Sequence, residues 1–111
     1  MILRHETVGD VLVIEPLMSS LDATSGEELR SAVEPLLEEE AKVVFDLGRV
    51  GFVDRAGLAA LLSCLKHIVA IGGDLKLCAT TPRVQHTFES TRLPKIIEIH
   101  PTRGEAVSSY A

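Results

Sequence analysis

An almost unbroken apolar run at residues 43–47, Val-Val-Phe-Asp-Leu, constrains the fold of this chain more than any other feature. A strand with one solvated face alternates apolar and polar residues, and this run does not. Strands covered on both faces are typical of parallel sheets, whose crossover connections place helices against the sheet. The run therefore predicts a central strand of an α/β fold.

The clearest helical pattern follows this strand. Apolar residues at 58, 61, 62, 65, 68 and 69 repeat at the spacing of one helix face, and Gly72-Gly73 supplies a stop. Because a surface helix must bury one such face, we expect the stripe to lie in the core rather than in a partner groove. The polar face, which includes Ser63, Lys66 and His67, is expected at the solvent or at the rim of a contact.

The first part of the chain predicts a hairpin and a helix. Two short β-branched runs, 2–8 and 11–16, flank Gly9-Asp10 with the spacing of a two-residue turn. The helix should begin among the capping residues Asp22, Thr24 and Ser25, with Ser25 and Glu28 spaced as a capping box. Pro35 should kink this helix or end it early.

The last part predicts a strand at 75–79, a helix from Thr81-Pro82 that Pro94 closes, and a short strand at 96–99. Thr102 and Glu105 are spaced as a capping box for a terminal helix. With right-handed crossovers, this order predicts one α/β domain over residues 1–111. Its mixed, mostly parallel sheet would have about five strands, the first antiparallel, packed against about four helices.

Composition narrows the possible functions. The chain has 111 residues, of which 46% are hydrophobic and 24% charged, as is ordinary for a folded domain. A net charge of -5 argues against a nucleic-acid partner, because phosphate binding requires clustered lysines and arginines. No apolar run approaches the roughly 20 residues of a membrane span, and residues 1–6 lack the pattern of a signal peptide. We therefore expect a cytoplasmic protein without membrane insertion.

The sequence shows no recognisable catalytic or metal-binding pattern. Cys64 and Cys78 fall in segments predicted to be core, so we expect both thiols to be buried, reduced and inert. Cys64 and His67 are spaced as a pair on one helix face, but no second pair completes a zinc site. Neither a nucleophile with a base nor a phosphate-binding glycine loop is present. We therefore expect no enzyme, no cofactor and no metal.

Residues 46–58 connect the buried strand to the leucine-rich helix through a tight loop. Asp54 is placed to accept hydrogen bonds from the free N–H groups of the first helical turn, a gain of about 1 kcal/mol. Gly57 leaves that turn without a side chain, so another backbone can approach it closely. This junction is the candidate binding segment of the chain.

At this junction the sequence resembles the STAS domain family, and in particular bacterial anti-sigma factor antagonists. The resemblance spans nearly the whole chain, and its motifs are specific through their shared order and spacing. They are Asp46-Leu47, Val53-Asp54, Gly57-Leu58 before a leucine-rich helix, Leu21-Asp22-Ala23, Gly72-Gly73 and Pro82-Arg83-Val84.

The resemblance implies a protein-binding regulator with a departure at its usual switch. In the family, the residue after the aspartate that matches Asp54 is typically a serine or threonine phosphorylated by an anti-sigma factor acting as a kinase. Here that position is Arg55, which cannot be phosphorylated, and the next is Ala56. A phosphate would add roughly -1.5 to -2 charges there, whereas a guanidinium is permanently positive. Arg55 can pair with Asp22 or Asp54, or reach an acidic group on a partner.

The resemblance places a partner-binding surface at both helix starts. Its expected residues are Asp22, Thr24, Phe52, Asp54, Arg55, Ala56, Gly57 and Leu58. Other interpretations stay open: both aspartates can act as helix caps alone, and Arg55 can be an ordinary exposed arginine or hold a phosphate at the helix N-terminus.

The leading functional hypothesis is an anti-sigma factor antagonist that sequesters a cytoplasmic, kinase-type anti-sigma factor and so releases a sigma factor. We expect a monomer or a weak dimer. An alternative keeps the fold but makes the chain an accessory subunit of another assembly, such as a lipid-transport ATPase or a stress-signalling complex. A third hypothesis is a small-ligand or nucleotide-binding module with an anion at the helix start of Asp54.

Overall fold

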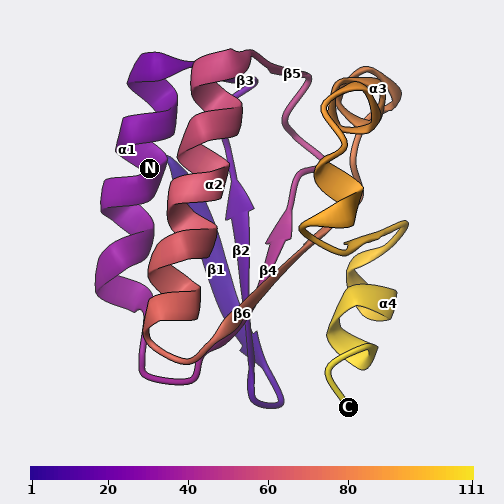
Figure 1. The fold of residues 1–111 in the computed structure, drawn as a ribbon. Helices are drawn as coiled ribbons and strands as arrows, with labels where there is room; N and C mark the ends of the chain where they lie inside the picture. The colour runs from indigo at the N-terminus through magenta and orange to yellow at the C-terminus, as the bar shows by residue number, and fades with distance from the viewer.

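The apolar run predicted to be a central strand lies in the middle of the sheet. The computed structural model describes all residues, Met1–Ala111. The strand β4 (Lys42–Asp46) pairs in parallel with β2 (Val11–Pro16) and with β6 (Asp74–Cys78). The five-stranded sheet has the order β1-β2-β4-β6-β7 and is shown in Figure 1. Only β1 is antiparallel to its neighbour, which confirms the predicted mixed sheet.

The predicted hairpin joins β1 (Leu3–Val8) to β2 through Gly9 and Asp10. Gly9 has a φ of 62°, which glycine adopts without the steric cost that a Cβ atom brings. The two-residue turn fixes the register, so that Leu3 lies opposite Pro16 and Val8 opposite Val11. The hairpin was therefore predicted correctly.

Helices cover the two faces of the sheet unequally. The helices α1 (Ala23–Val33) and α2 (Arg55–Ala70) lie side by side on one face and bury Phe45 of β4 in the main core, as Figure 1 shows. The short helix α4 (Arg103–Ser108) packs Ala106 against Val44 and Cys78 on the other face. Because side chains of β4 alternate between these faces, its run is buried throughout.

The first helix begins one turn earlier than its predicted capping box. Asp22 is the N-cap residue, and its partner in the box is Ser25 at the third helical position. The prediction that pairs Ser25 with Glu28 is wrong, because Asp22 holds the first free N–H groups and moves Ser25 inside the helix. Pro35 lies in a 3₁₀ turn, η1 (Glu34–Leu36), directly after α1, so the predicted early end is confirmed.

The second helix ends where the glycine pair predicted. Gly72 has a φ of 83°, a left-handed conformation that terminates helices. A Cβ atom on Gly73 would lie 2.3 Å from the Ala41 carbonyl oxygen, so this position requires a residue without a side chain. The pair lets the chain turn tightly from α2 into β6.

The segment after β6 differs from the prediction in two places. The helix α3 (Pro82–Ser90) ends before Arg92, whose φ of 61° is left-handed, so Pro94 does not close it and lies instead in the 3₁₀ turn η2 (Leu93–Lys95). The last strand, β7, covers Ile99–His100 rather than 96–99. The reason is packing: η2 directs Ile97 into the core, and pairing with β6 starts only at Ile99.

Two short strands that the sequence did not reveal form a second sheet. β3 (Ser20–Leu21) precedes α1, and β5 (Phe52–Val53) precedes α2. They pair in parallel, with Leu21 next to Val53. A Cβ atom on Gly57 would lie 2.1 Å from the Leu21 carbonyl oxygen, so the first turn of α2 rests directly on the β3 backbone.

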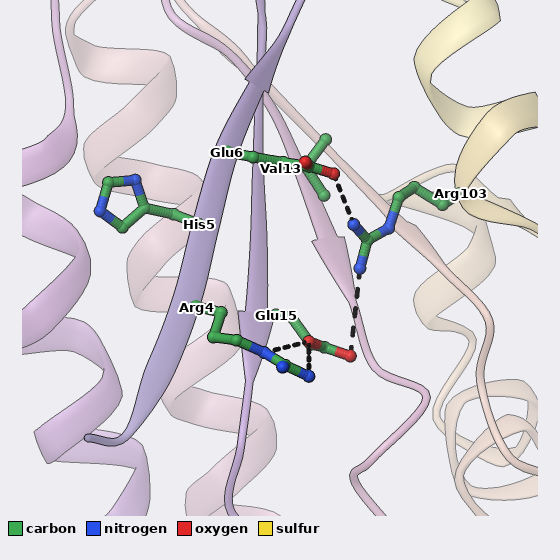
Figure 2. A pocket seen from close by; sticks show the side chains of 6 residues that line it. All are labelled: Arg4, His5, Glu6, Val13, Glu15 and Arg103. Atoms are coloured by element: carbon green, nitrogen blue, oxygen red, sulfur yellow. Dashed lines mark hydrogen bonds and ion pairs between the residues drawn. The ribbon is translucent and has the colours of Figure 1, made fainter.

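An ion-pair cluster ties the terminal helix to the sheet. Arg103 Nε donates to Asp46 Oδ2 at 2.9 Å, and Arg103 Nη1 donates to Glu6 Oε1 at 2.7 Å. Glu15 lies 4.0 Å from the same guanidinium and also pairs with Arg4 at 2.9 Å. Figure 2 shows Arg4, Glu6, Glu15 and Arg103 converging on one face of β1 and β2, while His5 points to the opposite side. Asp46 is buried, so its pair with Arg103 is the least solvated of the cluster.

Both cysteines are free and buried. Burial raises the pKa of the Cys64 thiol to about 11 and, with the nearby Asp46 carboxylate, that of Cys78 to about 12. Thiols with pKa values this high stay protonated at neutral pH and react slowly, because the thiolate is the nucleophile.

We predict that Arg103→Met lowers the free energy of unfolding by about 1–3 kcal/mol, because it leaves the buried Asp46 carboxylate without its counter-ion. The matched variant Arg4→Met removes an exposed pair and should change the same quantity by less than about 1 kcal/mol. Urea unfolding followed by circular dichroism measures both. Equal values for the two variants would contradict the special role of Arg103.

We predict that Gly57→Ala destabilises the chain by about 1–3 kcal/mol, because the added methyl group forces α2 away from Leu21. Gly104 offers a matched control, since a Cβ atom there meets nothing within 4 Å. The same change at Gly104 lies in an open helical position and should stabilise the chain by up to about 1 kcal/mol. Opposite signs in urea unfolding are the expected result.

Candidate functional site

The pairing of β3 with β5 brings two helix starts together. The Gly51 N–H donates to the Ser19 carbonyl at 2.8 Å, and the Asp54 N–H donates to the Leu21 carbonyl at 3.0 Å. Because Ser20 pairs with Phe52 and Leu21 with Val53, Asp22 and Asp54 take the next register position on each strand. Two parallel strand-to-helix junctions, far apart in sequence, therefore open on the same edge of the molecule.

Asp22 is bound by the first turn of α1. Its Oδ1 accepts a hydrogen bond from the Ser25 N–H at 3.0 Å, and its own N–H donates to Ser25 Oγ at 2.9 Å. The Ser25 hydroxyl lies 2.7 Å from the Ser20 carbonyl oxygen, to which it donates. The hydrogen bond from the Ser25 N–H is the main cause that holds the pKa of the Asp22 carboxyl below its ordinary value.

Asp54 has the same role at the start of α2. Its Oδ1 accepts a hydrogen bond from the Gly57 N–H at 2.8 Å, and its carbonyl accepts from the Leu58 N–H at 2.9 Å. The expected capping role of both aspartates is therefore confirmed. Each carboxylate is half-buried and bound to its own helix, and each still presents an edge to the solvent.

Arg55 and Ala56 occupy the first two positions of α2, and both are exposed. Arg55 forms an ion pair with neither Asp22 nor Asp54, contrary to one of the sequence-based possibilities. The basic side chains that do form ion pairs lie elsewhere: Arg4, Arg30, Lys42, Arg49, Lys76, His100 and Arg103. An unpaired positive charge thus lies at the start of α2, directly after the capping residue Asp54. Thr24, in the first turn of α1, is also exposed.

Gly57 and Leu58 differ from the expectation. The backbone that approaches Gly57 is that of Leu21 in the same chain, and Gly57 is buried, so it offers no surface to a partner. Leu58 is half-buried and packs against the main core. These inward contacts of Gly57 and Leu58 fix the position of the first turn of α2.

Phe52 is exposed to 37% of its possible area and lies beneath a second arginine. The Arg83 guanidinium lies 4.5 Å from the centre of its ring, a cation–π contact between β5 and the first turn of α3. Sequence reasoning missed this contribution of Arg83. The only available signal was the capping pattern Thr81-Pro82, which places Arg83 at a helix start but does not reveal its neighbour.

The loop between β4 and β5 is fixed at both ends. Asp46 Oδ1 accepts a hydrogen bond from the Gly48 N–H at 3.0 Å, and the Val50 N–H donates to the Leu47 carbonyl at 3.0 Å. The Thr81 hydroxyl donates to the Val50 carbonyl at 3.2 Å, which joins the loop to the start of α3. Val50 is fully buried, so the loop is anchored by packing as well as by hydrogen bonds.

The remaining polar hollows do not form a second site of this kind. The hollow in Figure 2 measures about 340 Å³, and the charged side chains that line it, Arg4, Glu6, Glu15 and Arg103, are paired with one another. No group of three or more His, Cys, Asp or Glu residues is placed to hold a metal ion. None of the helices has both the length and the apolar character needed to cross a membrane.

Known proteins resemble this chain over most of its length. BtrV of Bordetella bronchiseptica, named as an anti-sigma factor antagonist, is 28% identical over 102 residues, covering 91% of this chain and 88% of the relative. The anti-sigma-B factor antagonist of Bacillus subtilis is 31% identical over 83 residues, covering 75% and 76%. A solved anti-sigma factor antagonist (STAS) domain protein from Planctomyces limnophilus has the same fold, with a TM-score of 0.86, 23% identity and coverage of 98% and 97%.

The family comparison agrees with the motifs that suggested it. The model of the STAS domain matches residues 3–106, which include both strand-to-helix junctions and the start of α3. By this match, and by the identity to the Bacillus subtilis relative, the chain belongs to the STAS domain family.

Proposed function

We propose that this chain is an anti-sigma factor antagonist that binds a kinase-type anti-sigma factor and thereby releases a sigma factor. Two relatives that carry this name cover most of the chain, which supports the general role. The observation that carries the proposal is the unpaired guanidinium of Arg55, exposed at the start of α2. Such an arrangement favours protein binding over catalysis.

The proposed contact, here called the two-cap surface, consists of Asp22, Thr24, Phe52, Asp54, Arg55 and Ala56. Their backbones are held by the β3–β5 pairing and by the two capping interactions. A surface that is already ordered loses little conformational entropy when a partner docks, which favours affinity. Gly57 and Leu58, which the family resemblance also implied for the contact, pack inward instead: Gly57 lies against the Leu21 backbone and Leu58 against the main core.

Charge makes Arg55 the central residue of the proposed contact. Asp22 and Asp54 direct their carboxylates to backbone N–H groups of their own helices, whereas Arg55 has no partner within the chain. An arginine presents its donors in a planar fork that matches a carboxylate. We therefore propose that a carboxylate of the anti-sigma factor pairs with Arg55.

The same position explains why we propose binding without the usual switch. A phosphate at position 55 would place negative charge beside both capping aspartates and would repel a carboxylate of the partner. Arg55 has the opposite charge and no hydroxyl, and Ala56 has no hydroxyl either. We propose that docking at the two-cap surface is not interrupted by phosphorylation of this helix start.

We predict that Arg55→Glu weakens binding to the anti-sigma factor by at least about tenfold, since it replaces an attraction by a repulsion. The measurement is isothermal titration calorimetry with each purified kinase-type anti-sigma factor of the same genome. Lys42→Glu, a charge reversal at the opening residue of β4, is the charge-matched control and should bind normally. Equal affinity of the Arg55 variant and the wild type would refute the two-cap surface, and absence of binding by every anti-sigma factor would refute the function.

We predict that Arg55→Ser restores a phosphorylation site. Incubation with ATP and the anti-sigma factor that binds should add one phosphoryl group to this variant and none to the wild type, as read by intact-mass spectrometry. The modified variant should then bind more weakly than the unmodified one, because the phosphate repels the partner. Phosphorylation of the wild-type chain at any serine or threonine would contradict an unswitched antagonist.

A further inference from the structure

The outward side of α2 carries a stripe that begins at the two-cap surface. Arg55, Ala59, Leu62, Lys66 and Val69 follow one another at intervals of four and three residues, so they lie on one face of the helix. Leu62 is half-buried and the other four are exposed. We call these five residues the α2 stripe. The prediction that Val69 lies in the core is wrong, because this residue falls on the outward side, whereas the buried residues of α2 are Gly57, Leu61, Cys64 and Ile68.

A groove runs beside this stripe towards the turn η2. It measures about 500 Å³ and is lined by Ala59, Leu62, Ser63, Leu65, Lys66 and Ile96. Ile96 is exposed to 61% of its area and Val69 to 55%, although large aliphatic side chains are usually buried. The groove therefore offers apolar anchors on α2 and next to η2, and the small Ala59 in its lining lets another backbone come close.

The one charged side chain that lines the groove, Lys66, is positive. Helix α2 contains no aspartate or glutamate, and its lysine and arginine, Lys66 and Arg55, form no ion pair. Lys95, beside Ile96, is exposed and likewise unpaired. The neighbouring helix α1 differs, because Glu27 and Glu34 there are paired with Arg30. In a chain of net charge -5, an unpaired lysine thus lines this apolar groove, and a second exposed lysine directly precedes Ile96 in the sequence.

We infer that this groove binds an acidic, amphipathic helix of the anti-sigma factor, an inference that rests on the proposed function. From Arg55 to Lys66 the stripe is about 16 Å long, at about 1.5 Å per residue, so roughly three turns of a partner helix would cover it. Apolar residues of that helix would contact Leu62 and Ile96, and carboxylates would pair with Lys66 and Lys95. Because the stripe starts at Arg55, the partner would occupy the two-cap surface and the groove together.

Other occupants fit the charges less well. A polyanion such as nucleic acid or an anionic membrane would meet the net negative charge of the chain and only a few lysines and arginines at the groove. A second copy would bring the acidic α1 helix, but Arg30 already neutralises part of its charge. A separate acidic, amphipathic helix would pack against the apolar residues of the groove and form ion pairs with the unpaired lysines.

The test uses the anti-sigma factor that binds in the calorimetric experiment above. Lys66→Glu should raise its dissociation constant by about fivefold, with a smaller effect at high salt, and Ile96→Ala should raise it by about threefold. Lys42→Glu, an equal change of charge on the opening residue of β4, is the control and should bind within twofold of the wild type. Unfolding curves identify any variant that has lost its fold.

Position and partner are then checked by photo-crosslinking from residue 69, which is exposed, belongs to the α2 stripe and lies outside the groove lining. The crosslinked peptide should come from the anti-sigma factor and show acidic residues on one side of a helical apolar pattern. Exchanging its acidic residue for lysine should restore binding to the Lys66→Glu variant.

The outcomes separate the two proposals. If Arg55→Glu weakens binding while Lys66→Glu and Ile96→Ala do not, the function stands and the groove inference falls. A crosslink to a second copy of this chain, or to a segment without acidic residues, overturns the groove inference alone. If no anti-sigma factor binds the wild-type chain, both proposals fall.

Discussion

The candidate site depends on one short stretch of backbone pairing. Two hydrogen bonds, from Gly51 to Ser19 and from Asp54 to Leu21, join strands of only two residues each. The Leu21 carbonyl also fills the space that a side chain at Gly57 would need. Without this contact α2 would begin further from α1, and the two capping aspartates would no longer open on the same edge. Backbone atoms thus set the relative positions of the two helix starts, and the side chains determine the charge that these positions present.

The charged residues of the site differ in whether the chain itself supplies their partners. Both aspartates direct negative charge to helix N-termini, where it is favourable. Arg55 stands at the first position of α2, where the partial positive charge of the helix end opposes it. A cation in this position contributes nothing to the isolated helix and has no counter-ion in the chain. A carboxylate supplied from outside would relieve this arrangement, which is why the residue points to a partner rather than to internal stability.

Sequence patterns predicted the parts of the fold that depend on local periodicity and burial. The β4 run, the hairpin, the stop at Gly72 and the caps at Asp22 and Asp54 were all recognisable. The strands β3 and β5 were not, because two residues are too few to show an alternation. The contact of Arg83 with Phe52 and that of Gly57 with Leu21 join distant segments, so no local pattern could reveal them. The partner-binding assignment itself came from the family resemblance and stays a prediction.

The ion-pair cluster around Arg103 affects the order in which parts of the chain can fold. The bond from Arg103 to Glu6 joins residues 97 positions apart, so the contact can form only after residues 6–103 have all left the ribosome. Until then Val11, Val13 and Val44 have no α4 to cover them. Until α4 has been made, a nascent chain would therefore expose an apolar strand surface, and docking of this six-residue helix would protect that surface from aggregation.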